Sequence, residues 1–165
     1  MIILYYNKYM SRQKYNVGFD FDGVIHTDVT PADIHGQRHP NISFHDVPST
    51  PFYKIINLIK LYHEYNYNIY IITARSSRSK QIIKKTLDVF GISQYIPEQN
   101  IITTGDSHNG DKTYILDKLN IIDFYDDSIK IFNSILHAKK NNRLNNLHNC
   151  YMTLPEKNKI IKIKL

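Results

Sequence analysis

The sequence predicts an α/β protein: a three-layer, Rossmann-like sandwich with a mostly parallel central sheet. Two observations carry this prediction. Short apolar segments rich in β-branched residues alternate with segments of helical periodicity, and the connections between them are short. The chain has 165 residues of which 42% are hydrophobic, enough for one globular core. We therefore expect a single domain over residues 1–165, with helices on both faces of the sheet.

The expected strands are short and apolar, and several of them end in polar or acidic side chains. The segment "NVGFDF" ends beside two aspartates, and "IYIIT" ends in a threonine. We expect Val17 and Phe19 to be buried. The predicted strands are residues 16–21, 69–73, 100–105, 121–127 and 150–154.

The expected helices carry apolar residues at helical spacing. They are residues 51–66, 76–92, 111–120 and 128–141. Ser49 or Thr50 could cap the first helix, with Pro51 in its first turn. Gly91 ends the second helix. Its inward-facing residues are expected to be Ile82, Ile83, Leu87 and Phe90.

Two segments have no sustained period. Residues 24–49 are rich in Gly, Pro, Asp and His, and we expect a long loop or a small hairpin there, a small flap after the first strand. Its histidines lack the tight spacing of a zinc site, so we expect solvated or substrate-contacting side chains; they are His26, His35, His39 and His45. For residues 1–15 an extra strand, an arm exchanged with a partner and a disordered tail stay open.

The charge and the cysteine content bear on the kind of ligand and on the cellular location that we expect. The formal net charge of +6 favours anionic ligands such as phosphates, although the basic residues are spread along the chain and do not by themselves indicate a nucleic-acid binder. The lone Cys150 forms no intramolecular disulfide and is expected to be a small buried hydrophobe. The opening "MIILYY" is too short for a signal peptide or a membrane span. We expect a cytoplasmic, intracellular protein with no membrane partner.

Polar side chains gather where the predicted strands end. In an open α/β sheet such positions converge on one crevice. They are Asp20, Asp22, Thr73, Asp126 and Asp127, with Lys112 at the start of a helix. Several carboxylates in one crevice repel one another unless a divalent cation compensates them, and oxygen ligands favour Mg²⁺. The sequence therefore predicts a magnesium site that also binds a phosphate.

The predicted site supplies each part of a phosphoryl transfer. Asp20 would attack phosphorus and form an aspartyl phosphate. Asp22 would protonate the leaving oxygen and then activate water. Lys112 and the Thr73 hydroxyl would hold the charge on the equatorial oxygens. Lys118 is the alternative to Lys112, and Asp127 or Ser128 could in addition cap the following helix.

Four motifs, over about residues 16–132, resemble in type and order those of the haloacid dehalogenase (HAD) superfamily: "FDFDGVIHTD", "IYIITAR", "DK" at 111–112 and "FYDDS". The resemblance implies a nucleophile at Asp20, an acid/base at Asp22, a phosphate-binding hydroxyl at Thr73 and a conserved lysine at Lys112. It also implies that Mg²⁺ is bound by Asp20, Asp22 through its backbone carbonyl, and the pair Asp126 and Asp127, without deciding which of that pair ligates directly. The substrate phosphate is expected to contact Gly23, Ala74 and Arg75, although Arg75 could instead pair with an acid.

The resemblance also narrows the function. An acid at the position of Asp22 is typical of phosphatases and phosphotransferases of this superfamily. Only residues 24–49 remain for a flap, so the chain resembles a capless member, whose site is covered by a large substrate or a neighbouring subunit.

The expected activity is Mg²⁺-dependent hydrolysis of a phosphomonoester: a nucleotide, a nucleic-acid terminal phosphate, a sugar phosphate or a phosphoprotein. The alternatives are a phosphotransferase, a phosphoprotein phosphatase and a non-catalytic phosphate-binding module; a homo-oligomer stays open. A receiver domain is disfavoured because receivers carry the acidic pair first and the lysine last.

Overall fold

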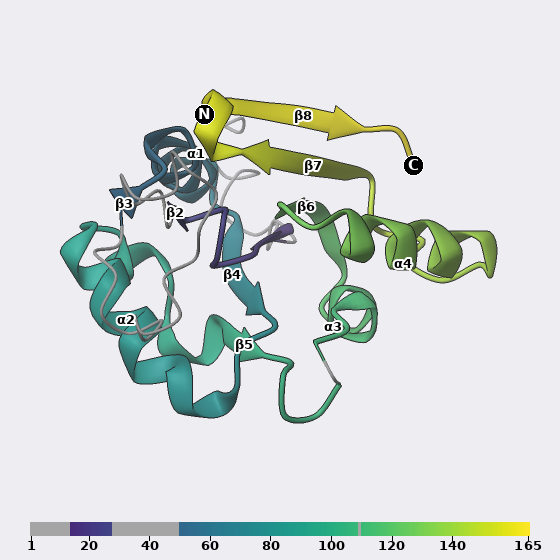
Figure 1. Cartoon of the computed structure of the whole chain (residues 1–165), viewed down its shortest axis with the longest axis horizontal. Coiled ribbons are helices and arrows are strands. Elements are labelled where there is room, and N and C mark those ends of the chain that lie inside the picture. The colour runs from purple at the N-terminus through teal and green to yellow at the C-terminus, as the bar shows by residue number, and fades with distance from the viewer. Residues whose placement is uncertain (1–13, 28–49, 109) are drawn as a thin grey trace, which may run out of the picture.

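The computed structural model describes residues 14–27, 50–108 and 110–165. Its centre is a six-stranded sheet in the order β5-β4-β1-β6-β7-β8 (Figure 1). All neighbouring pairs are parallel except β7 and β8, which are antiparallel. The strands are β1 (Asn16–Phe19), β4 (Asn68–Thr73), β5 (Ile101–Thr103), β6 (Ile121–Asp126), β7 (Asn149–Leu154) and β8 (Lys159–Ile163). The predicted α/β class with a mostly parallel sheet is confirmed.

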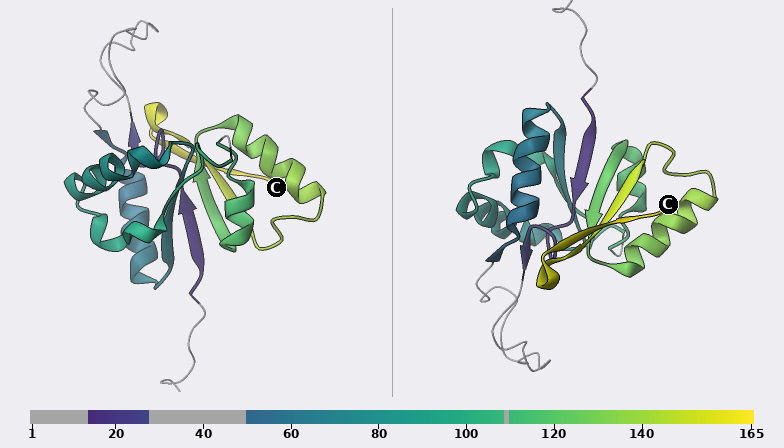
Figure 2. Two further views of the ribbon diagram at one scale, coloured as in Figure 1. Left: turned by 90° about the horizontal axis from the view of Figure 1, so that it is seen from below. Right: turned by 90° about the horizontal axis from the view of Figure 1, so that it is seen from above.

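Helices cover both faces of this sheet, α1 and α2 on one side and α3 and α4 on the other (Figure 2). The α-helices are α1 (Tyr53–Glu64), α2 (Lys80–Val89), α3 (Thr113–Lys118) and α4 (Ile129–Lys140). Short 3-10 helices are η2 (Ser77–Ser79), η3 (Ser93–Tyr95), η4 (Glu98–Asn100) and η5 (Pro155–Lys157). No helix in the described ranges is long and apolar enough to cross a membrane.

The core is divided in two by the sheet. Successive strand residues point to opposite faces, so Ile71 joins the cluster under α1 and α2, whereas Ile72 joins the cluster under α3 and α4. Val17 and Phe19 are buried as predicted, and so is Cys150, whose thiol is free. The two clusters hold the three layers together through apolar burial.

A small second sheet frames the predicted flap. β2 (His26–Thr27) pairs antiparallel with β3 (Thr50–Pro51), so Thr27 and Thr50, the described residues on either side of segment 28–49, lie side by side. Residues 28–49, with His35, His39 and His45, lie outside the described part of the chain, as do residues 1–13.

The start of the first helix differs from the prediction. Pro51 pairs with His26 in β3, and the backbone N–H of Phe52 donates to the Ile25 carbonyl over 3.0 Å. These contacts keep the chain extended until Tyr53, where α1 begins. Pro51 is therefore not in the first turn, and Thr50 does not cap the helix; Ser49 lies outside the described residues.

The prediction that Ile82 faces inward is wrong, and one strand was not predicted. Ile82 is 38% exposed, because on a helix it is rotated by about 100° from Ile83, which with Leu87 is buried. The segment "KIIKI" forms the edge strand β8 after a turn in which Asn158 has a φ of 49°. The lysines at both ends of the apolar pair interrupt the alternation that would predict a strand. Charged side chains on an edge strand commonly prevent it from pairing with a strand of another molecule.

Candidate active site

The strand order brings three predicted site residues to one edge of the sheet. β1 lies between β4 and β6, and all three strands run in the same direction. Asp20 follows β1, and its backbone N–H donates to the Tyr125 carbonyl on β6 over 2.8 Å. Thr73 and Asp126 are the last residues of β4 and β6. The carboxyl ends of these strands therefore form the predicted crevice.

Lys112 lies between two carboxylates of this edge. It immediately precedes α3, is 1% exposed, and places its Nζ 2.8 Å from Asp20 Oδ1 and 2.7 Å from Asp126 Oδ2. Burial alone would lower the pKa of Lys112, but the Asp20 and Asp126 charges outweigh it and raise that pKa. Lys118, the alternative, lies near the ring of Tyr114 instead. Lys112 is therefore the ammonium group of the site.

Three carboxylates form a cluster around this lysine. Ligand oxygens of Asp20, Asp126 and Asp127 all lie within 4.8 Å of one another. Burial raises the pKa of Asp20 to about 7 against the attraction of Lys112. Asp127 is exposed as a residue, but desolvation of its carboxyl group and the neighbouring Asp20 charge raise its pKa to about 6. Burial also raises the pKa of Asp126. One ammonium group does not compensate three carboxylates.

The donor set of the cluster fits a hard divalent cation. All candidate ligand atoms are carboxylate oxygens, which Mg²⁺ prefers. A cation would also remove the repulsion that raises the pKa of these groups. Asp126 Oδ1 already accepts from the Ser128 backbone N–H over 2.8 Å, so it is Asp126 that bonds to the start of α4. The predicted choice between Asp126 and Asp127 as direct ligand stays open.

Asp22 has surroundings unlike those of Asp20, two residues away. Arg75 Nε donates to Oδ2 over 2.8 Å and Nη2 donates to Oδ1 over 2.6 Å, while His26 Nε2 lies 2.8 Å from Oδ1. Burial would raise the pKa of Asp22, but its hydrogen bonds to His26 and Arg75 hold it well below the usual range. The Asp22 carboxylate is not one of the three in the cluster. Ligation of a metal through its backbone carbonyl stays a prediction.

The structure agrees with one of the roles predicted for Arg75 and corrects part of the expectation for His26. Of the two roles left open for Arg75, the structure shows pairing with an acid. His26 was expected to be solvated or to contact the substrate. The expectation of solvation is wrong, because His26 is 2% exposed and the centre of its ring lies 4.6 Å from that of Phe21. The backbone turn from Phe21, whose carbonyl accepts from Ile25 N–H, brings positions 22 and 26 together. The sequence feature that could have predicted the contact between Asp22 and His26 is their separation by four residues around a glycine turn.

Gly23 is required by its backbone and by its neighbour. Its φ is +69°, and a Cβ there would lie 2.1 Å from Asp127 Oδ2. Its carbonyl accepts from Thr153 Oγ1 over 2.8 Å, which ties the turn to β7. Glycine therefore lets the turn pack against the carboxylate cluster, while its predicted contact with substrate stays a prediction.

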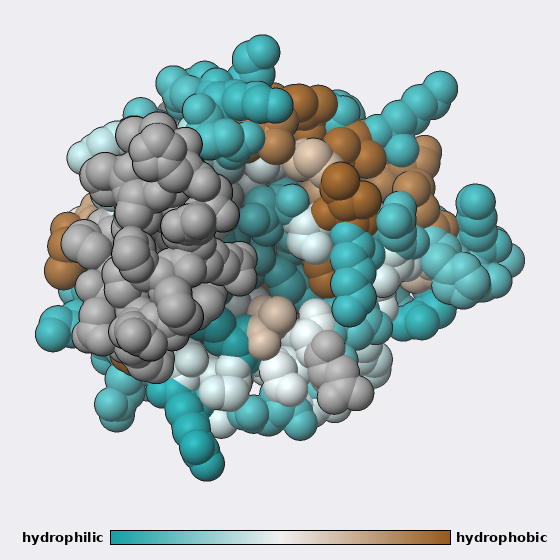
Figure 3. All heavy atoms as spheres, in the orientation of Figure 1, coloured by the Kyte–Doolittle hydropathy of each residue, from teal (hydrophilic) through white to brown (hydrophobic). Residues whose placement is uncertain are grey.

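Thr73 and Ala74 lie beside the cluster at the end of β4. Thr73 is buried, and its Oγ1 accepts from the Arg75 backbone N–H over 3.3 Å. Ala74 is exposed. In the orientation of Figure 1, the surface shows a recessed strip of hydrophilic residues near the centre of the molecule (Figure 3). Binding of a phosphate by Thr73 and Ala74 stays a prediction.

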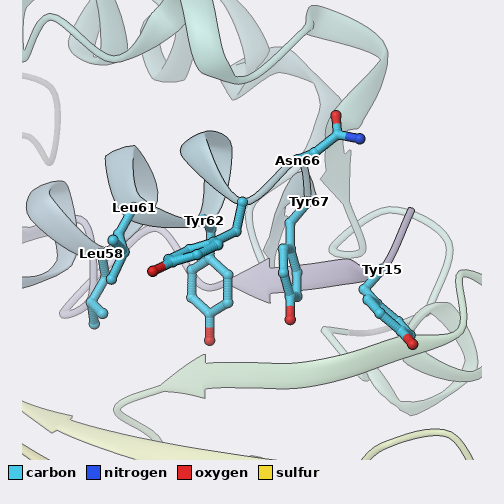
Figure 4. A pocket seen from close by; sticks show the side chains of 7 residues that line it. Tyr15, Leu58, Leu61, Tyr62, Asn66 and Tyr67 are labelled. Carbon is cyan, nitrogen blue, oxygen red and sulfur yellow. The ribbon is translucent and has the colours of Figure 1, made fainter. Parts of the chain in front are cut away.

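A separate hollow of about 750 Å³ lies at the other end of the sheet (Figure 4). It is bordered by the end of α1 and by the residues that precede β1 and β4, so it is far along the strands from the carboxylates. Its lining is Tyr15, Leu58, Leu61, Tyr62, Tyr65, Asn66 and Tyr67. The lining is uncharged and rich in tyrosine, unlike the crevice at the carboxyl end.

Comparison with known proteins adds a relative without a described activity. No model of a known protein family matches the sequence. The chain is 39% identical over 143 residues to an uncharacterized protein, L684, of Acanthamoeba polyphaga mimivirus. The match covers 86% of this chain and 28% of that protein, so the chain spans little more than a quarter of the relative's length.

Proposed function

We propose that this protein is a Mg²⁺-dependent phosphomonoester hydrolase of the HAD superfamily, built as a single capless domain, that works through an aspartyl phosphate. One observation carries the proposal. Asp20 is held by Lys112 inside a cluster with Asp126 and Asp127, at the carboxyl ends of adjacent parallel strands. These are the residues that the motif resemblance assigns to catalysis and metal binding.

Asp20, Asp126 and Asp127 would hold Mg²⁺, together with the backbone carbonyl of Asp22. When bound, the ion would supply positive charge to the phosphate oxygens. Lys112, whose ammonium is 2.8 Å from Oδ1, would orient Asp20 and would favour its ionised form together with the bound cation. The Thr73 hydroxyl would donate to the phosphate.

The reaction would proceed in two displacements at phosphorus. In the first, an oxygen of Asp20 forms a bond to phosphorus while the ester P–O bond breaks, and the leaving oxygen takes a proton from Asp22. This step requires Asp22 to be protonated in the substrate complex, although its pKa in the metal-free protein is low. In the second, water attacks the aspartyl phosphate and gives its proton to Asp22. The bond between phosphorus and Asp20 then breaks, which releases inorganic phosphate and restores the carboxylate.

The proposed substrates are nucleotides or nucleic-acid ends, because the net charge of +6 favours polyanions and the chain offers no room for a large cap. The alternatives are transfer of the phosphoryl group to another acceptor, action on a phosphoprotein, and phosphate binding without turnover. In the same proposal, the site is covered either by the bulk of the substrate or by a neighbouring copy of the chain.

A phosphate-release screen tests the proposal. The probes are nucleotides, sugar phosphates, 3′- or 5′-phosphorylated oligonucleotides, and p-nitrophenyl phosphate, each with MgCl₂ and with EDTA. Release is expected only with Mg²⁺ and is expected to disappear in Asp20→Asn. Asp123→Asn is the matched control, because Asp123 lies on β6 but bonds to Tyr62 and Asn149. Full activity in EDTA would contradict the mechanism. Transfer of the phosphoryl group to an added alcohol, instead of release as phosphate, would indicate a phosphotransferase.

A further inference from the structure

We propose that His26 and Arg75 are positioning residues that fix Asp22 so that one defined oxygen, Oδ2, transfers the proton to and from the reacting oxygens. The inference rests on the proposed function, because it concerns the acid/base of that reaction. It assigns Arg75 to the carboxylate of Asp22 in place of the substrate phosphate.

The hydrogen bonds to the two oxygens of Asp22 are unequal. Oδ1 accepts from Arg75 Nη2 over 2.6 Å, and it lies 2.8 Å from His26 Nε2. An ionised carboxylate only accepts, so Nε2 carries the hydrogen and donates it. Oδ1 thus accepts two hydrogen bonds, one for each of its lone pairs.

Oδ2 accepts a hydrogen bond from Arg75 Nε over 2.8 Å. Among the described residues it accepts no second hydrogen bond, which leaves a lone pair that can take a proton from water or hold the proton given to the leaving oxygen. The side chain of Asp22 is 33% exposed, so it can reach a bound substrate. Saturation of one oxygen selects the other for proton transfer.

Packing against one aromatic ring holds the two residues that bond to Asp22, His26 and Arg75. His26 is buried on β2, with its ring 4.6 Å from that of Phe21. The guanidinium of Arg75 lies 5.0 Å from the centre of the same ring, on which it can form a cation-π contact. Because one ring contacts both partners, the orientation of the Asp22 carboxylate is set by the fold. A fork of two N–H groups matched to one carboxylate also explains arginine in place of lysine.

The test compares esters whose leaving oxygens need protonation to different extents. An alkyl ester such as glycerol 3-phosphate requires the acid, whereas p-nitrophenyl phosphate has a stabilised leaving oxygen and requires it little. His26→Leu and Arg75→Gln are expected to lower kcat on the alkyl ester about 10- to 100-fold and to change the aryl ester much less. His26→Gln, which can present an N–H at a similar reach, is expected to restore part of the loss. The exposed Arg78, three residues after Arg75, provides the control Arg78→Gln.

A second readout needs no activity. Urea unfolding in EDTA is measured for the wild type, His26→Leu, Asp22→Asn and the double variant. His26→Leu is expected to lower the midpoint much less in the Asp22→Asn background than in the wild type, since its partner has already been changed. Equal effects in both backgrounds would overturn the inference.

The outcomes separate the inference from the function on which it rests. Equal loss on both esters, a rise in KM without loss of kcat, or unchanged or higher activity would overturn the positioning role while leaving the phosphatase proposal intact. A wild type that releases phosphate from no ester of the screen would reject the proposed function and with it this inference, even if the unfolding data show that His26 and Asp22 are coupled.

Discussion

The carboxylates at the two ends of the sheet have partners of opposite kinds. At the carboxyl end, Asp20, Asp126 and Asp127 form a cluster, and the ammonium group of Lys112 contacts the first two. Nearer the amino end, Asp123 accepts from the Tyr62 hydroxyl over 2.9 Å and from Asn149 Nδ2 over 2.7 Å. The carboxyl end has more carboxylates than the contacting ammonium group can compensate, whereas the carboxylate of Asp123 accepts hydrogen bonds from neutral donors.

This difference separates a site from a structural network. Burial raises the pKa of both Tyr62 and Tyr125, whose hydroxyl oxygens are 3.0 Å apart, so both stay protonated. The tyrosine network therefore adds no charge to that of Asp123 and does not bring carboxylates together that need a cation between them. The carboxylate cluster does, because its repulsion is relieved only by protons or by a cation.

Removal of the ammonium group is expected to have the largest effect. Lys112→Met leaves the buried carboxylates of Asp20 and Asp126 without their cation, which should cost about 3–5 kcal/mol of stability in metal-free protein. Lys118→Met, on the outer part of α3, should change stability by less than about 0.5 kcal/mol. Urea unfolding in EDTA at neutral pH measures both variants. Equal losses would show that the lysine between the carboxylates has no special role.

The stability of the metal-free protein is expected to fall as pH rises from about 4 to 7. The pKa of Asp20 is about 7 in the fold against an ordinary 3.8, so the folded state keeps a proton that the unfolded state has lost. The stabilisation is complete below 3.8 and disappears as the pH rises through the folded pKa, a loss on the order of a few kcal/mol. The lowered pKa of Asp22 acts in the opposite sense but below this window.

Mg²⁺ should flatten this pH profile, since it replaces the protons as the compensating charge. Asp20→Asn should make it less steep without Mg²⁺, while the raised pKa values of Asp126 and Asp127 leave part of the slope. Chemical unfolding at several pH values, with EDTA or MgCl₂, gives the comparison. A wild-type profile that is flat in EDTA would contradict the account of the cluster.

The smallest effect is expected at the tyrosine network. Tyr62→Phe removes one donor to Asp123, which still accepts from Asn149, and should cost about 1 kcal/mol. Phosphate release should change less than about twofold, because the change lies at the far end of the strands. A loss of activity with unchanged stability would argue against the division between the two ends.

The sequence predicted the placement of the site because that placement depends on local patterns. Apolar strands that end in Asp20, Thr73 and Asp126 specify the carboxyl edge once the sheet is parallel, and Lys112 follows from its position before a helix. Pairing of Arg75 with an acid was one of two roles left open, but the sequence did not identify Asp22 as that acid. The contact of His26 with Asp22 was not predicted, since it depends on the turn between β1 and β2. The first turn of α1 was mispredicted because Pro51 suits either a helix start or an edge strand.

The most direct test of the central claim uses beryllium fluoride, which with Mg²⁺ mimics a phosphoryl group bound to an aspartate and needs no knowledge of the substrate. ¹⁹F NMR of the protein with MgCl₂ and beryllium fluoride is expected to show a bound signal. That signal should be absent in EDTA and in Asp20→Asn, and present in the control Asp123→Asn. A wild type without a bound signal, or an equal signal in Asp20→Asn, would contradict the role of Asp20 as the residue that carries the phosphoryl group.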